Sequence, residues 1–336
     1  MLIHRLKTVW YLHVPACATN KQAQDFYFFT SIKNKLMRYN ILLCAAAIVM
    51  AAACHRATVT AVTPYANTEI RNAKGDTILA GHCATDMLLQ PHYRQWFQQS
   101  YNSYAVDSAT ALQLQPLLAG KTIEVFLGTW CGDSRREVPR LIKLLQVAAF
   151  DTSHLHLVFV DNAPGTYKQS PAHEEKGKLI HHVPTIIVYD KKELGRVVET
   201  PVVSLEKDLL RIVKEGDYVS KYRLAEHMRR KGLYNSKPLP DKQLSDLATE
   251  VKPLAANAGE LSVVGFVLNA QQQYAAALNV YRLNILLYPA EPALYGRVAG
   301  VYAAMGNREK AKWYYNKVLE LKPGDIDAAK QLASLQ

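Results

Sequence analysis

The apolar positions in the central part of the chain change their period along the sequence. Continuous apolar runs at 122–128, 155–161 and 185–190 predict buried strands. Apolar residues at helical spacing over 135–147 and 205–215 predict two helices, the second of which follows a further strand. This order of elements predicts an α/β region.

The residues before this pattern, 70–118, predict a short strand at 77–80 and helices at 93–104 and 109–118. Aromatic residues recur at helical spacing in the first of these helices, namely Trp96, Phe97, Tyr101 and Tyr104. We expect these rings to pack on the sheet. The alternative is a ligand-stacking surface.

The C-terminal part carries an internal repeat with an offset of 34 residues. The matching pairs are Gly265 and Ala299, Tyr274 and Arg308, Ala277 and Ala311, Tyr281 and Tyr315, and Pro289 and Pro323. We expect a helix at 241–251 or the α/β region to cover one end and 326–335 to cap the other. The basic segment 216–240, with Pro238 and Pro240, predicts a connection between the two parts.

This period, with small residues where two helices would cross and proline at the repeat end, resembles the tetratricopeptide repeat. The resemblance implies an all-α C-terminal domain that binds protein partners on the inner face of its first helices. The residues expected there are Ser262, Phe266, Asn269, Gly296, Gly300 and Ala303. The alternative is a purely structural appendage.

The main candidate for chemistry is the turn Trp130-Cys131-Gly132-Asp133-Ser134, which links a predicted strand to a predicted helix. The free N–H groups and dipole at a helix N-terminus favour a thiolate, which is the nucleophilic form of cysteine. The sequence therefore predicts that Cys131 is a nucleophile.

This turn, followed by Pro139 and by Val183-Pro184-Thr185, resembles the active-site turn and cis-proline loop of the thioredoxin family over residues 121–216. The resemblance implies a thioredoxin-like α/β fold with a central mixed sheet flanked by helices. It also assigns roles, with Cys131, Ser134 and Trp130 as catalytic residues and Val183, Pro184 and Thr185 as substrate-binding residues.

Two positions depart from the family pattern. Ser134 occupies the place of the second, resolving cysteine, and Val125 that of the buried carboxylate that accepts a proton. Without a resolving cysteine, a mixed disulfide must be released by the client's own thiol or by a small thiol. That chemistry suits disulfide isomerisation or deglutathionylation.

Other reactive side chains offer weaker candidates. Cys83 is either a buried small hydrophobe or a disulfide partner of Cys131. His154 and His156 share a strand face without a third ligand nearby in sequence, and we predict no metal site. His181-His182 precedes the cis-proline loop and either tunes the thiol or serves packing. The sequence has no glycine-rich phosphate loop, and we predict no cofactor. Residues 162–176 predict a surface insertion.

The N-terminal part predicts export. The apolar run 41–53 follows Lys33, Lys35 and Arg38 and ends in three alanines before Cys54, which resembles a bacterial lipoprotein signal. We expect Met37 to be the true start, with Cys54 lipidated. The alternatives are an ordinary cleaved signal or a short anchor. In each case the mature chain lies outside the cytoplasm, in the cell envelope, facing the periplasm or the outer surface.

The net charge of +11 includes +5 within residues 1–53, which leaves a mild and dispersed excess elsewhere. This pattern argues against nucleic acid as a partner. The expected organisation is an over-extended start at 1–36, a signal peptide at 37–53, a tether at 54–69, a thioredoxin-like domain at 70–216, a linker and helix at 217–257, and two repeats with a capping helix at 258–336.

Two functions are compatible with these patterns. The first is thiol-disulfide exchange on client proteins or a small thiol through Cys131, in a protein that its N-terminal lipid holds at the membrane. The second is a non-catalytic envelope scaffold that binds proteins through both domains.

Overall fold

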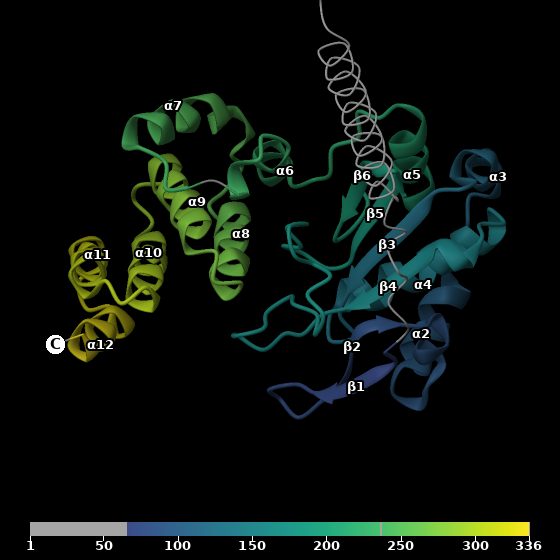
Figure 1. Ribbon diagram of the computed structural model, residues 1–336, viewed down its shortest axis with the longest axis horizontal. Helices are drawn as coiled ribbons and strands as arrows, with labels where there is room; N and C mark the ends of the chain where they lie inside the picture. The colour runs from purple at the N-terminus through teal and green to yellow at the C-terminus, as the bar shows by residue number, and fades with distance from the viewer. Residues whose placement is uncertain (1–65, 236, 336) are drawn as a thin grey trace, which may run out of the picture. The chain divides into compact units, whose positions relative to one another are not determined.

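A mixed sheet of six strands forms the first part of the described chain, and helices form the part that follows it (Figure 1). The computed structural model describes residues 66–235 and 237–335. The sheet order is β1-β2-β4-β3-β5-β6. The strands span Thr68–Arg71 (β1), Thr77–Cys83 (β2), Thr122–Leu127 (β3), Leu155–Phe159 (β4), Thr185–Asp190 (β5) and Lys192–Val198 (β6).

Strands β3 and β4 run parallel, and every other neighbouring pair in the sheet is antiparallel. A parallel pair needs a crossover connection, which the helix after β3 supplies. The four helices around the sheet are α2 (Pro91–Ser103), α3 (Ser108–Leu118), α4 (Gly132–Val147) and α5 (Leu205–Lys214). The predicted strands and helices of this part are therefore confirmed to within a few residues.

The main core lies between one face of the sheet and helices α2 to α5. Alternate residues of β3, Ile123, Val125 and Leu127, enter this core because side chains of a strand alternate between its two faces. The four aromatic residues of α2 and its end (Trp96, Phe97, Tyr101 and Tyr104) pack against the same core. The expectation that they pack on the sheet is confirmed.

The opposite face of the sheet carries a smaller apolar cluster that contains Phe126, Val158, Ile180 and Val183. The segment between β4 and β5 contributes to it. This segment contains the predicted surface insertion, yet Lys168, Ser170 and Glu175 within it are buried. Burial is possible because the Glu175 carboxylate accepts hydrogen bonds from the backbone N–H and the hydroxyl of Ser170, at 3.0 and 2.5 Å.

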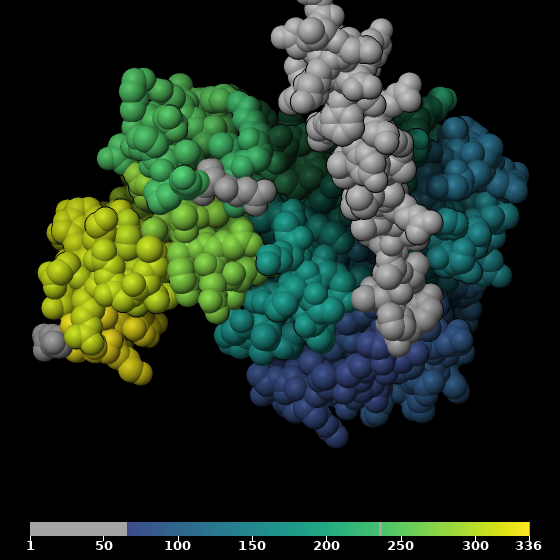
Figure 2. All heavy atoms as spheres, in the orientation of Figure 1, coloured from purple at the N-terminus to yellow at the C-terminus, as the bar shows by residue number. Residues whose placement is uncertain are grey.

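The helical part consists of α6 to α12, drawn from green to yellow in Figures 1 and 2. Two antiparallel pairs, α8 with α9 and α10 with α11, repeat with the predicted offset, since α9 begins at Tyr274 and α11 at Arg308. The helices span Arg223–Arg230 (α6), Asp241–Val251 (α7), Gly259–Ala270 (α8), Tyr274–Leu287 (α9), Pro292–Ala304 (α10), Arg308–Leu321 (α11) and Ile326–Ser334 (α12).

The two ends of these pairs are covered as the sequence predicts. Helix α7 packs against α9, and α12 packs against α11. Inside the first pair, Gly265 allows the ring of Tyr281 to approach closely, because a Cβ atom at residue 265 would lie 2.4 Å from Tyr281 Cε1. The small residue at this helix crossing is therefore a packing requirement.

The predicted connection at 216–240 contains helix α6, which is tied to the sheet by charged side chains. Arg196 of β6 is buried and pairs with Glu193 at 2.7 Å. Arg229 of α6 bonds to both Glu193 and Glu226, at 3.0 and 2.8 Å. The connection is thus a packed element, and the described sheet and helices form one compact unit.

The expected signal peptide, the lipidation site Cys54 and most of the tether lie outside the described residues. Strand β1 begins at Thr68, within the last residues assigned to the tether, so the sheet starts slightly earlier than expected. In residues 66–235 and 237–335, no helix combines the length and apolar character needed to cross a membrane.

Candidate functional site

Cys131 lies at the N-cap of α4, directly after the turn that follows β3. Its N–H donates to Gly128 O at 2.9 Å, and its carbonyl accepts from Arg135 N at 3.0 Å, which closes the first helical turn. The half-buried thiol donates to Val183 O at 3.1 Å. The structure therefore brings together Cys131 and Val183, which the sequence separates by 52 positions.

Trp130 is held in place from two sides. Its Nε1–H donates to Val160 O at 2.8 Å, at the end of β4. Its ring covers Gly128 so closely that a Cβ atom at residue 128 would lie 2.4 Å from Trp130 Cε2. Gly128 is consequently required for the ring position beside the cysteine.

The segment Val183-Pro184-Thr185 leads into β5, and the Val183–Pro184 peptide bond is cis. The Thr185 hydroxyl donates to His182 O at 2.7 Å. Pro184 O accepts from Glu199 N at 2.7 Å, which ties the segment to the end of β6. These bonds hold the Val183 carbonyl against the cysteine.

Ser134 is buried in the first turn of α4, with 1% of its surface exposed. Its hydroxyl oxygen accepts a hydrogen bond from Gly128 N at 3.3 Å. This bond joins the helix to the end of β3. A role of Ser134 toward the thiol stays a prediction.

Sequence reasoning missed Tyr167 and Lys168, which lie beside the cysteine. The Tyr167 ring packs against Trp130 with a centroid distance of 6.3 Å. Lys168 is 4% exposed, and its Nζ donates to His181 O at 2.6 Å. Burial lowers the pKa of Lys168 to about 8, against the opposing effect of Cys131. Both residues lie in a turn-rich segment without periodicity, so no sequence signal marked them.

The adjacent histidines of the loop pack with Tyr222. The His182 ring stacks on Tyr222 at 4.1 Å, and His181 meets the same ring edge-on at 5.3 Å. Burial lowers the pKa of both histidines to about 3. The Tyr222 hydroxyl donates to Glu199 at 2.5 Å. Because their pKa values are this low, both imidazoles are neutral at pH 7. The loop that carries them leads directly to Val183.

The helical part reaches this site through Phe266 of α8, whose ring contacts Tyr167 edge-on at 5.0 Å. Phe266 belongs to the expected inner face of the repeats, so part of that face packs against the chain itself. Gly296 and Gly300 differ from expectation, because a Cβ atom on either would point toward α11, 3.7 Å from Val318 and 4.0 Å from Tyr315. Binding of a partner on this face is left to proposal.

The remaining candidates lie away from the turn. Cys83 of β2 is buried, both described cysteines are free thiols, and burial raises the pKa of Cys83. The structure therefore supports Cys83 as a small buried hydrophobe. His156 lies 5.4 Å from the ring of His82. Within the part of the chain that the structure describes, no three His, Cys, Asp or Glu side chains form a metal-binding group.

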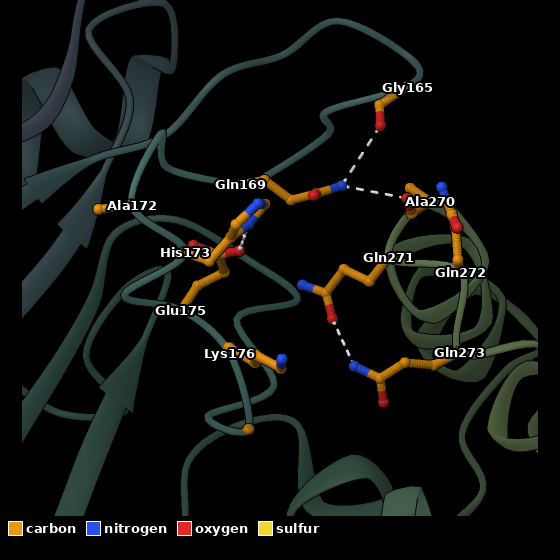
Figure 3. Close-up of a pocket in the computed structure, with 11 residues that line it drawn as sticks. Gly165, Gln169, Ala172, His173, Glu175, Lys176, Ala270, Gln271, Gln272 and Gln273 are labelled. Atoms are coloured by element: carbon orange, nitrogen blue, oxygen red, sulfur yellow. Dashed lines mark hydrogen bonds and ion pairs between the residues drawn. The ribbon is translucent and has the colours of Figure 1, made fainter.

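A cavity of about 750 Å³ lies between the segment 165–177 and the turn after α8 (Figure 3). Gln169 Nε2 donates across it to Ala270 O at 3.1 Å, and Gln273 Nε2 donates to Gln271 Oε1 at 3.0 Å. Cys131 is not among the residues that line it. The cavity is therefore separate from the thiol.

Comparison with known proteins gives matches among solved structures only. No protein-family model and no curated protein sequence matches the chain. Among solved structures, the chain is similar to the Yersinia enterocolitica type III secretion chaperone SycD in complex with a peptide of the translocator YopD. The identity is 16%, the match covers 34% of this chain and 88% of that chain, and the TM-score is 0.24. A TM-score this low assigns neither fold nor function.

Proposed function

We propose that the protein is a thioredoxin-like protein of the cell envelope that carries out thiol-disulfide exchange through Cys131, as an isomerase or a mixed-disulfide reductase. The observation that carries the proposal is the position of the half-buried thiol at the start of α4, 3.1 Å from the carbonyl of Val183 before the cis peptide bond.

The order of elements supports a thioredoxin-like fold. Strands β3 and β4 are parallel and joined through α4, while β5 and β6 form an antiparallel pair followed by α5. The central strand order β4-β3-β5-β6 places the Cys131 turn after a middle strand of the sheet. The helix pairs with an offset of 34 residues likewise support tetratricopeptide repeats in the C-terminal part.

The proposed reaction begins when the Cys131 thiolate attacks one sulfur of a client disulfide. A new S–S bond forms between Cys131 and the client, the client's bond breaks, and its second sulfur leaves as a thiolate that takes a proton from water. A client thiol or a small thiol then attacks the mixed disulfide and regenerates Cys131. In isomerisation no net electrons are transferred. In deglutathionylation the attacking thiol supplies the reducing electrons.

The surroundings of the thiol support binding of an extended client. Val183 lies directly before β5, next to the thiol, and the aromatic rings of Trp130 and Tyr167 pack together nearby. Strand-like addition of a client segment would supply main-chain hydrogen bonds without sequence specificity. Within the proposed substrate-binding segment, Val183 would therefore contact the client backbone, while Pro184 and Thr185 hold Val183 in place through their bonds to Glu199 and His182.

The test is intact-mass analysis of the processed chain, which begins at the lipidated Cys54 and keeps Cys83 and Cys131 as thiols, purified without reductant and then exposed to oxidised glutathione. We expect an adduct of one glutathione per chain, absent in Cys131→Ser and retained in Cys83→Ser. The adduct should disappear when reduced glutathione is added. An unmodified wild-type mass after this treatment would contradict the proposal.

A scaffold function is the second candidate, and an exposed aromatic cluster favours it. Trp313 of α11 is 54% exposed and borders a cavity of about 320 Å³ whose other walls include Tyr295, Tyr314 and Leu286. This function would be favoured if Cys131 were unreactive and if a protein partner bound the wild type but not Trp313→Ala.

The proposed location in the envelope rests on the N-terminal sequence alone. We propose that Cys54 becomes a lipidated N-terminus and tethers the described part to a membrane. Mass analysis of the N-terminal peptide from membrane fractions tests this point. Cys54→Ala should release the chain from membranes, and a soluble wild-type chain with a free Cys54 thiol would refute the proposal.

A further inference from the structure

Lys168 carries a buried amine that takes no part in the proposed exchange reaction. Lysine is almost never fully buried unless it is paired, because removing an ammonium group from water costs free energy. The Nζ of Lys168 donates to a backbone carbonyl, that of His181, and lies 4.4 Å from the centroid of the Tyr167 ring. Within residues 66–235 and 237–335 it forms no ion pair with a carboxylate.

A loop after β4, closed by two backbone hydrogen bonds, holds Lys168 in this place. The Lys168 N–H donates to Asp161 O, and the Asp161 N–H donates to Gln169 O, both at 2.9 Å. Lys168 itself has φ +56°, a backbone conformation that non-glycine residues adopt uncommonly. The chain thus accepts an unfavourable backbone angle at the residue that carries the buried amine.

The Lys168 amine and the Cys131 thiol both bind backbone carbonyls of the segment 181–183. The carbonyl that Lys168 binds belongs to His181, two residues before Val183, whose carbonyl accepts from the Cys131 thiol. The titratable groups that face Lys168 come from four segments of the chain: Cys131 at the start of α4, Glu199 after β6, Tyr167, and His181 with His182 in the loop before β5.

Few of these neighbours can carry charge near neutral pH. Both histidines are neutral there. The Glu199 carboxylate accepts hydrogen bonds from Lys221 and Tyr222, at 2.5 Å each, so its charge is paired with that of Lys221. The position of the buried carboxylate in the resembling family is the apolar Val125, and Glu124 beside it accepts instead from Lys178 at 2.7 Å. Lys168 is therefore the buried cation that interacts electrostatically with the cysteine.

We propose that Lys168 is a positioning residue for Cys131, which fixes the 181–183 segment through the His181 carbonyl and supplies the counter-charge to the Cys131 thiolate. The inference rests on the proposed function, and it places a buried cation near a thiol whose family carboxylate position is the apolar Val125. A cation in this place also favours substrates that bring negative charge next to their sulfur, such as glutathione disulfides.

The pKa of Lys168 sets the pH range of this effect. Burial lowers that pKa to about 8, while Cys131 and Glu199 act to raise it. Lysine is charged below its pKa and neutral above it, so the counter-charge is present at pH 7 and lost by pH 9.5.

The first test compares alkylation of Cys131 in the wild type and in Lys168→Met, followed by mass spectrometry of the Cys131 peptide. We expect iodoacetamide to react about fivefold more slowly in the variant at pH 6.5, and equally fast at pH 10, where free thiols are ionised. Lys168→Arg, which keeps the charge, should recover most of the rate. Lys178→Met serves as the matched control, because Lys178 binds Glu124 and should not change the rate.

The second test needs only the wild-type chain, so it holds even if Lys168→Met fails to fold. The ratio of the alkylation rates with iodoacetate and iodoacetamide should fall by about threefold between pH 7 and pH 9.5, because the anionic reagent loses an attractive cation. A constant ratio, or a folded Lys168→Met variant that alkylates like the wild type at both pH values, would overturn the proposal. Absence of mixed disulfides with normal alkylation would instead refute only the exchange function.

Discussion

The crossing of α8 and α9 in the repeat part allows a sharp test of how the helices pack. Gly265 of α8 faces the buried ring of Tyr281 in α9. A Cβ atom at residue 265 would lie 2.4, 2.6 and 2.7 Å from three ring carbons of Tyr281. Because real Cβ atoms do not approach other heavy atoms this closely, Gly265→Ala must push the two helices or the ring apart.

The magnitude follows from two opposing effects. Alanine in place of glycine inside a helix stabilises it by about 1 kcal/mol. Overpacking a well-packed core costs about 1–3 kcal/mol, and three contacts below 3.0 Å place this case at the upper end. We therefore expect Gly265→Ala to lower the free energy of unfolding by about 2 kcal/mol.

Gly300→Ala in α10 is the matched control. Its Cβ atom would meet only the Tyr315 hydroxyl, at 4.0 Å, so only the helix-propensity gain of about 1 kcal/mol should remain. The two variants should therefore shift the urea midpoint in opposite directions, as measured by far-UV circular dichroism at unchanged slope.

A double variant isolates the contact. In a Tyr281→Leu background the ring is absent, so Gly265→Ala should become stabilising by about 1 kcal/mol. If Gly265→Ala stabilises the wild-type chain as much as Gly300→Ala does, the packing argument is refuted. Amide hydrogen exchange in α8 and α9 would locate any loss of stability to this pair.

Three further outcomes are expected. Ser134→Cys should form a disulfide with Cys131 on mild oxidation, seen as a loss of two hydrogens in the intact mass; two free thiols after oxidation would contradict the proposed turn. Gly128→Ala should displace Trp130, lower the free energy of unfolding by about 1–3 kcal/mol and shift the tryptophan emission, and unchanged emission would refute the close contact. Burial lowers the pKa of His182 to about 3, below about 6.5 in the unfolded chain, so the unfolded chain binds more protons and wild-type stability falls as the pH drops below about 6.5. His182→Phe should reduce the change in the free energy of unfolding with pH by up to about 1.4 kcal/mol per pH unit. Urea titrations at pH 7.0 and 5.0 measure this change, and an equal change in the variant and the wild type would disprove the assignment.

The local elements of this protein could be predicted from the sequence alone. Strand β5 and helix α7 begin and end at the predicted residues, and the helix pairs follow the predicted 34-residue offset. The sequence likewise predicted that α4 begins at the Cys131 turn. Each of these features depends on periodicity or on turn chemistry within a few residues, so neighbouring side chains carry enough information.

The surroundings of the thiol depend on contacts between segments that are far apart in the sequence. Lys168 and Tyr167 lie in a segment without a periodic pattern, and only the tertiary fold buries Lys168 and half-buries Tyr167. Phe266 contacts Tyr167 across 99 positions of the sequence, and the Val183 carbonyl meets the Cys131 thiol across 52. Such contacts depend on where long loops close and on which buried polar groups find partners. A linear pattern cannot specify that, because both outcomes are settled by the packing of the whole chain.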